Sequence, residues 1–280
     1  MRKTQKGIKD HMKQKVTGIV TKQKEIAPAI FDLWIKTELA KDVKPGQFVG
    51  VFTKDKSALL PRPISICEVN ADRTALRIVY RIAGQGTKEF SGWQTGEEVQ
   101  ILGVLGNGFP LEKGKGKKVF LMGGGIGIPP MLELAKELAA QDQASAPEGG
   151  NGTVIQCIMG YRDSKTFLKE DLEQYGKVYV ATEDGSVGTK GNVLDAIREN
   201  AIAADVIFAC GPMPMLRAIK AYAQEQGILA YISLEEHMAC GVGACLGCVV
   251  KTKEVDHHSH VHNARICTDG PVFEAGEVEI

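Results

Sequence analysis

The chain has 280 residues, enough for about two domains at roughly 150 residues each. Its 34 Lys and Arg residues balance 34 Asp and Glu residues, which argues against nucleic acid or an anionic membrane as the main partner, because phosphate binding needs a surplus of cations. There is no run of about 18 apolar residues that could cross a membrane, and the basic N-terminus lacks the apolar stretch of a secretory signal. Together with an odd number of cysteines, seven, this favours the reducing cytoplasm.

Residues 1–13 are expected to form a basic N-terminal extension, and residues 14–112 a small antiparallel β-barrel. The barrel is indicated by short runs rich in Val, Ile, Phe and Thr. Turn sequences such as Lys44-Pro45-Gly46 separate these runs. The predicted strands are 15–23, 26–37, 47–53, 62–69 and 75–83.

The pattern changes after a polar, glycine-rich connection at 111–118, and residues 113–234 are expected to form an α/β domain. Strand-like and helix-like segments alternate there, which predicts a doubly wound parallel sheet. The predicted strands are 118–122, 153–159, 177–181, 204–210 and 228–234, and the predicted helices are 131–140 and 215–226.

The last segment, residues 235–280, has no sustained period and holds four of the seven cysteines. About 46 residues are too few to fold reliably on an apolar core alone, so a bound metal centre is expected to compensate. The His-rich stretch 257–262 within it is expected to be a solvated loop, with metal ligation as the alternative.

The cysteine spacing predicts what that centre is. Cys240, Cys245 and Cys248 form a C-x4-C-x2-C motif, and Cys267 follows after 18 intervening residues. This is the spacing of plant-type [2Fe–2S] ligation. A structural zinc site is the alternative, although such sites usually pair two C-x2-C knuckles and this chain has one. The remaining alternative is four unligated cysteines. No Cys-x-His pair exists for a Rieske centre.

Two segments of the α/β domain are candidates for a dinucleotide-binding site. Glycines at 123, 124, 125 and 127 follow a predicted strand and precede a predicted helix, where backbone amides can face a phosphate. Cys210-Gly211-Pro212-Met213 ends the fourth predicted strand. Because ligands bind beyond the carboxyl ends of parallel strands, both segments are expected to flank one crevice. A plain tight turn and a small buried Cys210 are the alternatives.

The barrel has its own candidate residues. Arg62 of Arg62-Pro63-Ile64-Ser65 offers a planar fork for a pyrophosphate, and the Ser65 hydroxyl can reach a ring edge. Tyr80 is expected to stack on an aromatic ligand. Gly86-Thr87 opens a predicted helix and could receive another phosphate. Ordinary surface or barrel packing is the alternative for each of these residues.

Taken together, these motifs resemble the ferredoxin–NADP reductase superfamily. The segments 233–248 and 266–273 narrow the match, because they closely resemble the electron-transfer subunits of NAD-dependent dihydroorotate dehydrogenases of type B. The resemblance covers residues 14–280. It implies a flavin-binding barrel, a nucleotide-binding α/β domain and a small C-terminal cluster module, in a flavin-dependent NAD oxidoreductase subunit without catalytic acid or base residues of its own.

The resemblance also implies the cofactors and their ligands. FAD would be held by Arg62, Pro63, Ile64, Ser65, Val79, Tyr80, Arg81, Gly86 and Thr87. NAD would be held by Gly123, Gly124, Gly125, Gly127, Cys210, Gly211, Pro212 and Met213. A [2Fe–2S] cluster would be held by Cys240, Cys245, Cys248 and Cys267. Two features depart from the family pattern, namely the long gap before Cys267 and the N-terminal extension.

The implied partner is an FMN-containing catalytic subunit that oxidises dihydroorotate to orotate in pyrimidine biosynthesis, in a heterotetramer. Electrons would pass from FMN through the cluster and FAD to NAD⁺, and an apolar, glycine-lined surface around Cys240–Cys248 would dock the partner. The competing functions are the same carrier serving a sulfite reductase, hydrogenase or transhydrogenase complex, a self-contained oxygenase reductase, or a zinc-stabilised binding module. The preference for NAD over NADP is left open.

Overall fold

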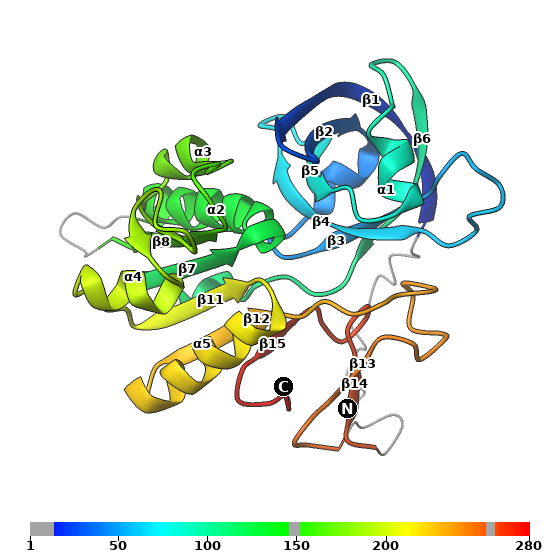
Figure 1. Ribbon diagram of the computed structural model, residues 1–280. Coiled ribbons are helices and arrows are strands. Elements are labelled where there is room, and N and C mark those ends of the chain that lie inside the picture. The colour runs from blue at the N-terminus through cyan, green and yellow to red at the C-terminus, as the bar shows by residue number, and fades with distance from the viewer. Residues whose placement is uncertain (1–13, 146–151, 256–260) are drawn as a thin grey trace.

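A computed structural model describes residues 14–145, 152–255 and 261–280. The expected N-terminal extension lies outside these ranges, as do residues 256–260, which include the first four residues of the His-rich stretch. Among the described helices, none is both long and apolar enough to span a bilayer. Figure 1 shows a barrel standing beside a layered α/β domain, with the C-terminal segment running below both.

The barrel is closed and antiparallel, as predicted, with strand order β1-β2-β5-β4-β3-β6. Its strand β6 was not among the predicted runs. The predicted strand at 26–37 is interrupted, because a turn with Ala29 at φ 60° separates β1 from β2. The strands are β1 (Gln14–Ala27), β2 (Ile30–Lys36), β3 (Phe48–Val51), β4 (Arg62–Val69), β5 (Ala75–Arg81) and β6 (Glu98–Leu105), with the 3₁₀ turn η1 (Glu38–Asp42) and the short helix α1 (Gln85–Phe90).

The second part is a seven-stranded sheet of order β10-β9-β8-β7-β11-β12-β15, whose first six strands pair in parallel. All five strands predicted from the sequence are present. They are β7 (Lys118–Gly124), β8 (Val154–Tyr161), β9 (Lys177–Thr182), β11 (Val206–Cys210) and β12 (Leu229–Ser233), joined by the two-residue β10 (Thr189–Lys190).

Helices cover both faces of this sheet, as the doubly wound pattern predicted. Along β7, Val119 and Leu121 pack towards one layer, and Phe120 and Met122 towards the other, because successive side chains of a strand point to opposite faces. The first layer holds α2 (Pro129–Ser145) and α3 (Lys169–Glu173), and the second holds α4 (Val193–Glu199) and α5 (Met213–Gln226). The short 3₁₀ turns are η2 (Leu111–Lys113) and η3 (Gly125–Gly127).

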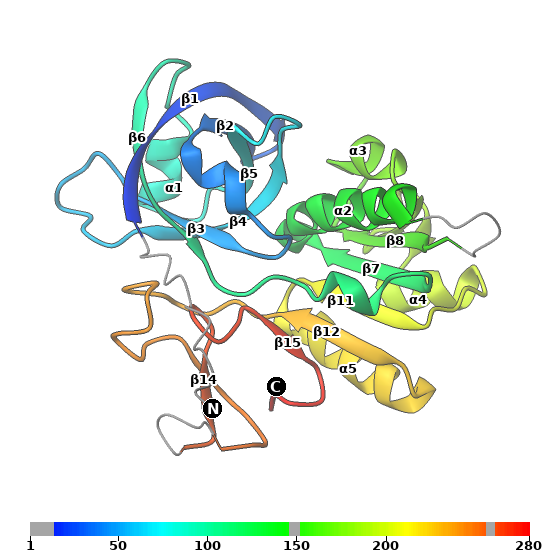
Figure 2. The same cartoon turned by 180° about the vertical axis from the view of Figure 1, so that it is seen from behind.

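The C-terminal segment is tied into the neighbouring sheet. Its last strand, β15 (Val272–Glu274), pairs antiparallel with β12 and forms an edge of the seven-stranded sheet. Before it, β13 (Val249–Lys251) and β14 (Asn263–Arg265) form a two-stranded ribbon. Figure 2 shows this ribbon below the barrel strands β3 and β6, where Phe48 and Leu105 share a core with Ile266. The limits 113–234 and 235–280 stay predictions, and the segment after residue 235 completes a sheet that begins before it.

Candidate functional site

Two of the four C-terminal cysteines, Cys248 and Cys267, are brought together by the β13–β14 ribbon. Cys248 directly precedes β13 and Cys267 follows β14, and the register of the ribbon places Val249 opposite Arg265. The Ile266 N–H donates to the Cys248 carbonyl at 2.8 Å, which extends the pairing by one residue. The long gap before Cys267 is therefore spanned by a ribbon that returns the chain to Cys248.

The loop that carries Cys240 and Cys245 turns its amides towards the thiols. The Val242 N–H lies 3.4 Å from Cys240 Sγ, and the Gly247 N–H lies 3.4 Å from Cys245 Sγ. Gly241 and Gly243 have φ of 67° and 83°, a region that glycine enters without steric cost. Burial disfavours the thiolate of Cys240, but the backbone N–H groups outweigh it and lower its pKa to about 6. Such amides would stabilise thiolate ligands.

The thiols influence one another in two pairs. The Cys245 thiol helps to lower the pKa of Cys240, and the Cys248 thiol helps to raise the pKa of Cys267. Burial, followed by the neighbouring Cys248 thiol, raises the pKa of Cys267 to about 12. Across the described ranges, no three His, Cys, Asp or Glu side chains converge on a single point that would hold one ion. In a [2Fe–2S] cluster each iron has two thiolates and two bridging sulfides, which agrees with thiols grouped in two pairs.

The surface beside these thiols is apolar. Cys245 is exposed, whereas Cys248 and Cys267 are buried. Around Cys245, Val242 is 38%, Leu246 63% and Val249 40% exposed. Leu246 has φ 56°, a conformation that is uncommon for a residue with a side chain. An exposed patch of this kind is typical of a protein interaction site.

In the barrel, the structure brings two of the predicted flavin-binding segments into contact. Arg62 begins β4, and its guanidinium lies against Gly86 of α1, where an added Cβ would be 2.2 Å from Arg62 Nε. The Arg62 guanidinium also donates to the Leu60 carbonyl at 2.5 Å. The Thr87 hydroxyl accepts from the Ala83 N–H at 2.8 Å and so fixes the start of α1. A cation and the N-terminal turn of α1 therefore lie side by side.

The expectation that Tyr80 stacks on a ligand is wrong. Its side chain is 1% exposed and points into the barrel, between Phe31 and Phe90 at ring-centroid distances of 5.8 and 5.9 Å. Burial raises the pKa of its hydroxyl. On the opposite face of β5, Val79 packs towards the α/β domain. Tyr80 could thus contact a flavin only through its backbone.

The two predicted nucleotide-binding segments meet at the carboxyl edge of the parallel sheet. Cys210, the last residue of β11, pairs with Gly123 of β7. Gly127 ends the 3₁₀ turn so close to β11 that an added Cβ would be 2.3 Å from the Cys210 carbonyl oxygen. Gly125 has φ 53° and faces open space, with no atom within 4 Å of an added Cβ. The turn is therefore packed against β11 on one side and open on the other, as a phosphate site requires.

One residue at this edge was not singled out from the sequence. Glu235 follows β12, and its carboxylate acts electrostatically on both the Cys210 thiol and the Arg81 guanidinium. Glu235 is exposed to solvent, but desolvation by the groups around its carboxylate raises its pKa, and Arg81 partly offsets this shift. Burial and then Glu235 also raise the pKa of Cys210. Glu235 thus lies between residues predicted to bind FAD and residues predicted to bind NAD. Its only sequence signal was its place in the 233–248 motif.

Comparisons with known proteins match two separate parts of the chain to known families. Residues 121–221 match the family described as the oxidoreductase NAD-binding domain, and residues 235–279 match the iron-sulfur cluster binding domain of dihydroorotate dehydrogenase B. Among solved structures, that of the NADH-dependent reduced ferredoxin-NADP oxidoreductase is similar at a TM-score of 0.80 and 28% identity, covering 94% of this chain and 89% of that one.

A ferredoxin NADP⁺ reductase from Neisseria gonorrhoeae has the same fold at a TM-score of 0.63 and 16% identity, covering 80% of this chain and 95% of that one. The ferredoxin-reductase-like fold is thereby confirmed.

Relatives of known assignment cover almost the whole chain. The electron transfer subunit of dihydroorotate dehydrogenase B (NAD(+)) from Geobacillus sp. (strain WCH70) is 40% identical over 271 residues, covering 95% of this chain and 99% of that protein. The same subunit from Bacillus cereus (strain B4264) is 43% identical over 271 residues, with the same coverage. The chain therefore belongs to the family of electron transfer subunits of dihydroorotate dehydrogenase B (NAD(+)).

Proposed function

We propose that this chain carries electrons between a partner subunit that oxidises dihydroorotate and NAD⁺, with a [2Fe–2S] cluster and FAD bound in this chain. The observation that carries the proposal is the ribbon that brings Cys267 next to Cys248, together with the loop whose amides face the sulfur atoms of Cys240 and Cys245, in the segment that matches the cluster-binding family. Nicotinamide exchanges two electrons as hydride, flavin accepts two and releases them singly, and the cluster carries one, which requires FAD between the other two.

The residues of this chain supply binding and orientation. The four cysteine thiolates would ligate the cluster, and the amides of Val242 and Gly247 would donate to thiolate sulfur. Hydrogen bonds of this kind raise a cluster's reduction potential by stabilising its more negative state. Arg62 and the start of α1, which lie against each other, would hold the FAD phosphates.

At the other end of the path, the Gly123–Gly127 turn would hold the NAD pyrophosphate, and Cys210–Met213 would line the nicotinamide side. Cys210 would serve as a buried neutral wall, because burial holds its thiol protonated at physiological pH. Proton abstraction from dihydroorotate would belong to the partner subunit.

The partner is proposed to be the FMN-containing catalytic subunit, in a heterotetramer. The apolar surface of Val242, Leu246 and Val249 around the exposed Cys245 supports docking at this point. It would put the partner next to the thiol pair Cys240–Cys245, the pair closer to solvent. The electron path would then enter this chain at the cluster and leave at NAD⁺.

An anaerobic NADH titration of the purified, cofactor-loaded chain tests the cofactor content. Bleaching that needs about three electrons per chain is expected, two for FAD and one for the cluster. A two-electron endpoint with zinc and without iron or acid-labile sulfide would overturn the cluster assignment.

Cys245→Ser tests the order of the path. It should abolish reduction of NAD⁺ by dihydroorotate with the partner subunit, while oxidation of NADH by artificial dyes at the flavin continues. Cys157→Ser is the matched control, because Cys157 is buried in the sheet, remote from this loop in sequence. Loss of dye reduction in a folded, FAD-loaded Cys245→Ser variant would contradict the proposed order.

A second candidate is the same carrier in another complex, which is favoured by the similarity to the NADH-dependent reduced ferredoxin-NADP oxidoreductase. The two functions differ in their electron donor. If the loaded chain reduces NAD⁺ with reduced ferredoxin but not with the dihydroorotate-oxidising subunit, the second candidate is correct.

A further inference from the structure

The helix that follows the nucleotide-binding turn binds both backbone groups of one barrel residue, Val69. Backbone pairing of β4 on the side of β3 ends with the bond from the Ile66 N–H to the Gln47 carbonyl, so this edge of β4 has no strand partner at Val69. At Val69, the last residue of β4, side chains of helix α2 bind the backbone groups that a neighbouring strand would otherwise bind. Glu133 Oε2 accepts from the Val69 N–H at 2.9 Å, and Lys136 Nζ donates to the Val69 carbonyl. Both backbone groups of one barrel residue are therefore bound by side chains of the other domain.

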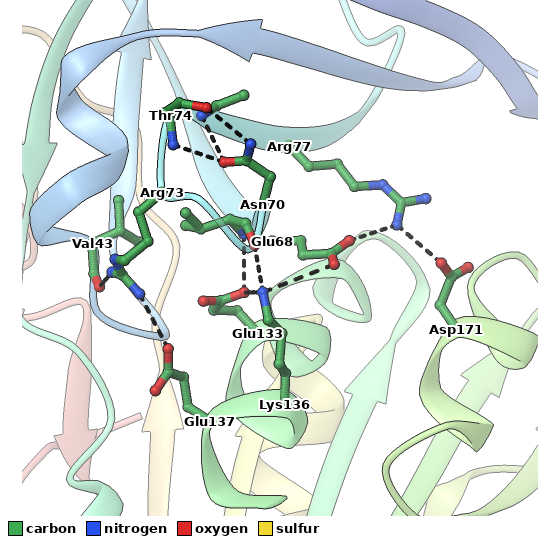
Figure 3. Close-up of polar contacts among 12 residues, drawn as sticks. Val43, Glu68, Asn70, Arg73, Thr74, Arg77, Glu133, Lys136, Glu137 and Asp171 are labelled. Atoms are coloured by element: carbon green, nitrogen blue, oxygen red, sulfur yellow. Dashed lines mark hydrogen bonds and ion pairs between the residues drawn. The ribbon is translucent and has the colours of Figure 1, made fainter. Parts of the chain in front are cut away.

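The two side chains that make this contact also bind each other. Lys136 Nζ lies 3.3 Å from Glu133 Oε2 and 4.0 Å from Glu68 Oε1. Glu133 is 1% exposed, so its carboxylate is available only to groups at this interface. Figure 3 shows Glu133 and Lys136 reaching up from α2 to the end of β4, with Glu137 and Arg73 forming a separate ion pair further along.

The same interface continues to α3 through a buried cation. Arg77 of β5 makes two hydrogen bonds of 2.9 Å to Asp32, and it also binds Glu68 at 3.0 Å and Asp171 of α3 at 3.1 Å. Glu68 thus faces Arg77 on one side and Lys136 on the other. Charged side chains of the two domains form one connected network, which gives the contact a single orientation.

The position of this contact relates it to both cofactor sites. β4 begins with Arg62–Ser65, the predicted flavin-binding motif, and ends at Val69. α2 begins directly after Gly123–Gly127, the predicted nucleotide-binding turn, and carries Glu133 in its second turn. One strand and one short stretch of helix therefore separate the two motifs, and the contact at Val69 joins them rigidly.

We propose that Glu133 and Lys136 are positioning residues for hydride transfer, because they hold the nucleotide-binding turn in a fixed place relative to the flavin-binding strand. This inference rests on the proposed function. Hydride transfer needs the reacting atoms about 3–3.5 Å apart, and a misplacement of about 1 Å can cost roughly 100-fold in rate. Two hydrogen bonds to the backbone of one residue, Val69, are suited to keep the nucleotide-binding turn within that distance of its place relative to the flavin-binding strand.

The test compares two substitutions at one position. Glu133→Leu removes the acceptor for the Val69 N–H, whereas Glu133→Gln keeps an acceptor oxygen and removes the charge. In the FAD-loaded chain, stopped-flow reduction of the flavin by NADH should slow by roughly 10- to 100-fold in Glu133→Leu and by less than about threefold in Glu133→Gln. Reduction by dithionite, which needs no bound nucleotide, should be unchanged in both.

A second readout does not depend on activity. Hydrogen–deuterium exchange of the Val69 amide should accelerate in Glu133→Leu and stay near wild type in Glu133→Gln. Glu137→Leu is the matched control, because Glu137 is on the same helix but pairs with Arg73 at a partly exposed site. It should leave both the rate of NADH reduction and Val69 exchange near wild type.

If Glu133→Leu fails to bind FAD or to fold, Lys136→Met replaces it in the test. The Lys136 side chain is 25% exposed, and its removal leaves the hydrogen bond between the Val69 N–H and Glu133 in place. The inference is overturned if folded, FAD-loaded Glu133→Leu and Lys136→Met variants are reduced by NADH at the wild-type rate. A wild-type chain that binds FAD but is not reduced by NADH would overturn the proposed function itself.

Discussion

Gly127 is the point at which the two nucleotide-facing segments touch, and its replacement by alanine perturbs that contact alone. A Cβ at this position would lie 2.3 Å from the Cys210 carbonyl oxygen, 2.5 Å from its carbonyl carbon and 2.6 Å from the Gly211 nitrogen. All three are backbone atoms, so no side-chain rotation relieves the overlap. Ordinary contact begins at 3.4 Å, so the turn and the end of β11 must separate by about 1 Å.

This displacement sets the expected magnitudes. Overpacking at a well-packed site costs about 1–3 kcal/mol, so the free energy of unfolding should fall by that amount in Gly127→Ala. The separation also moves two sides of the proposed nicotinamide crevice apart. We therefore expect the rate of flavin reduction by NADH to fall by roughly 10- to 100-fold.

Denaturant unfolding and stopped-flow reduction by NADH measure the two effects separately. Gly276→Ala is the matched control, because an added Cβ there meets its nearest neighbour at 3.6 Å and Gly276 does not have a positive φ. Its unfolding free energy and reduction rate should stay near wild type. A folded, FAD-loaded Gly127→Ala chain with unchanged NADH kinetics would refute the idea that the turn and the end of β11 form one nucleotide-binding surface.

Three further predictions concern the interfaces. Arg77→Met should lower the free energy of unfolding by about 3–5 kcal/mol in denaturant titrations, because it leaves the buried Asp32 carboxylate without its ion-pair partner. As a control, Arg198→Met, which removes the exposed ion pair with Asp195, should change the free energy of unfolding by less than about 1 kcal/mol. Leu246→Glu should weaken binding of the proposed catalytic partner at least about tenfold in titration calorimetry without loss of iron; unchanged affinity would place the docking surface elsewhere. Burial raises the pKa of Glu133. The contribution of this residue to stability is therefore fully present below its unfolded pKa and is lost as pH rises through its folded pKa. Glu133→Gln should flatten that part of the stability–pH curve, and an unaltered curve would argue against the shift.

Local patterns predicted most of the architecture. Alternating strand and helix periods identified the five main parallel strands, and turn residues separated the barrel strands, because these signals arise from neighbours in the chain. The C-x4-C-x2-C spacing and the glycine turn likewise place their reactive groups within a few residues of one another. The cluster could be predicted for the same reason, since its ligand spacing is local, whereas FAD and NAD were expected from the family resemblance.

Local sequence patterns could not predict the contacts between segments that are far apart in the chain. The tyrosine of β5 was expected to face a ligand, but the register with β2 and the placement of α1 bring Phe31 and Phe90 against its ring, so it lies in the core. The strand β15 carries no strong periodic signal, and only its pairing with β12 makes it part of the sheet. Glu133 and Lys136 read as ordinary polar helix residues until α2 is packed against the open edge of β4.

The sequence by itself therefore determined the chemistry of this protein, namely four thiols with the spacing of a binuclear cluster and a glycine turn between a strand and a helix. Only the tertiary structure decided how these groups are placed. It pairs Cys267 with Cys248 across the β13–β14 ribbon and fastens the nucleotide-binding helix to the flavin-binding strand at Val69. The physical reason is that spacing along a chain constrains only nearby atoms, whereas the distance between remote segments is set by strand register and side-chain packing.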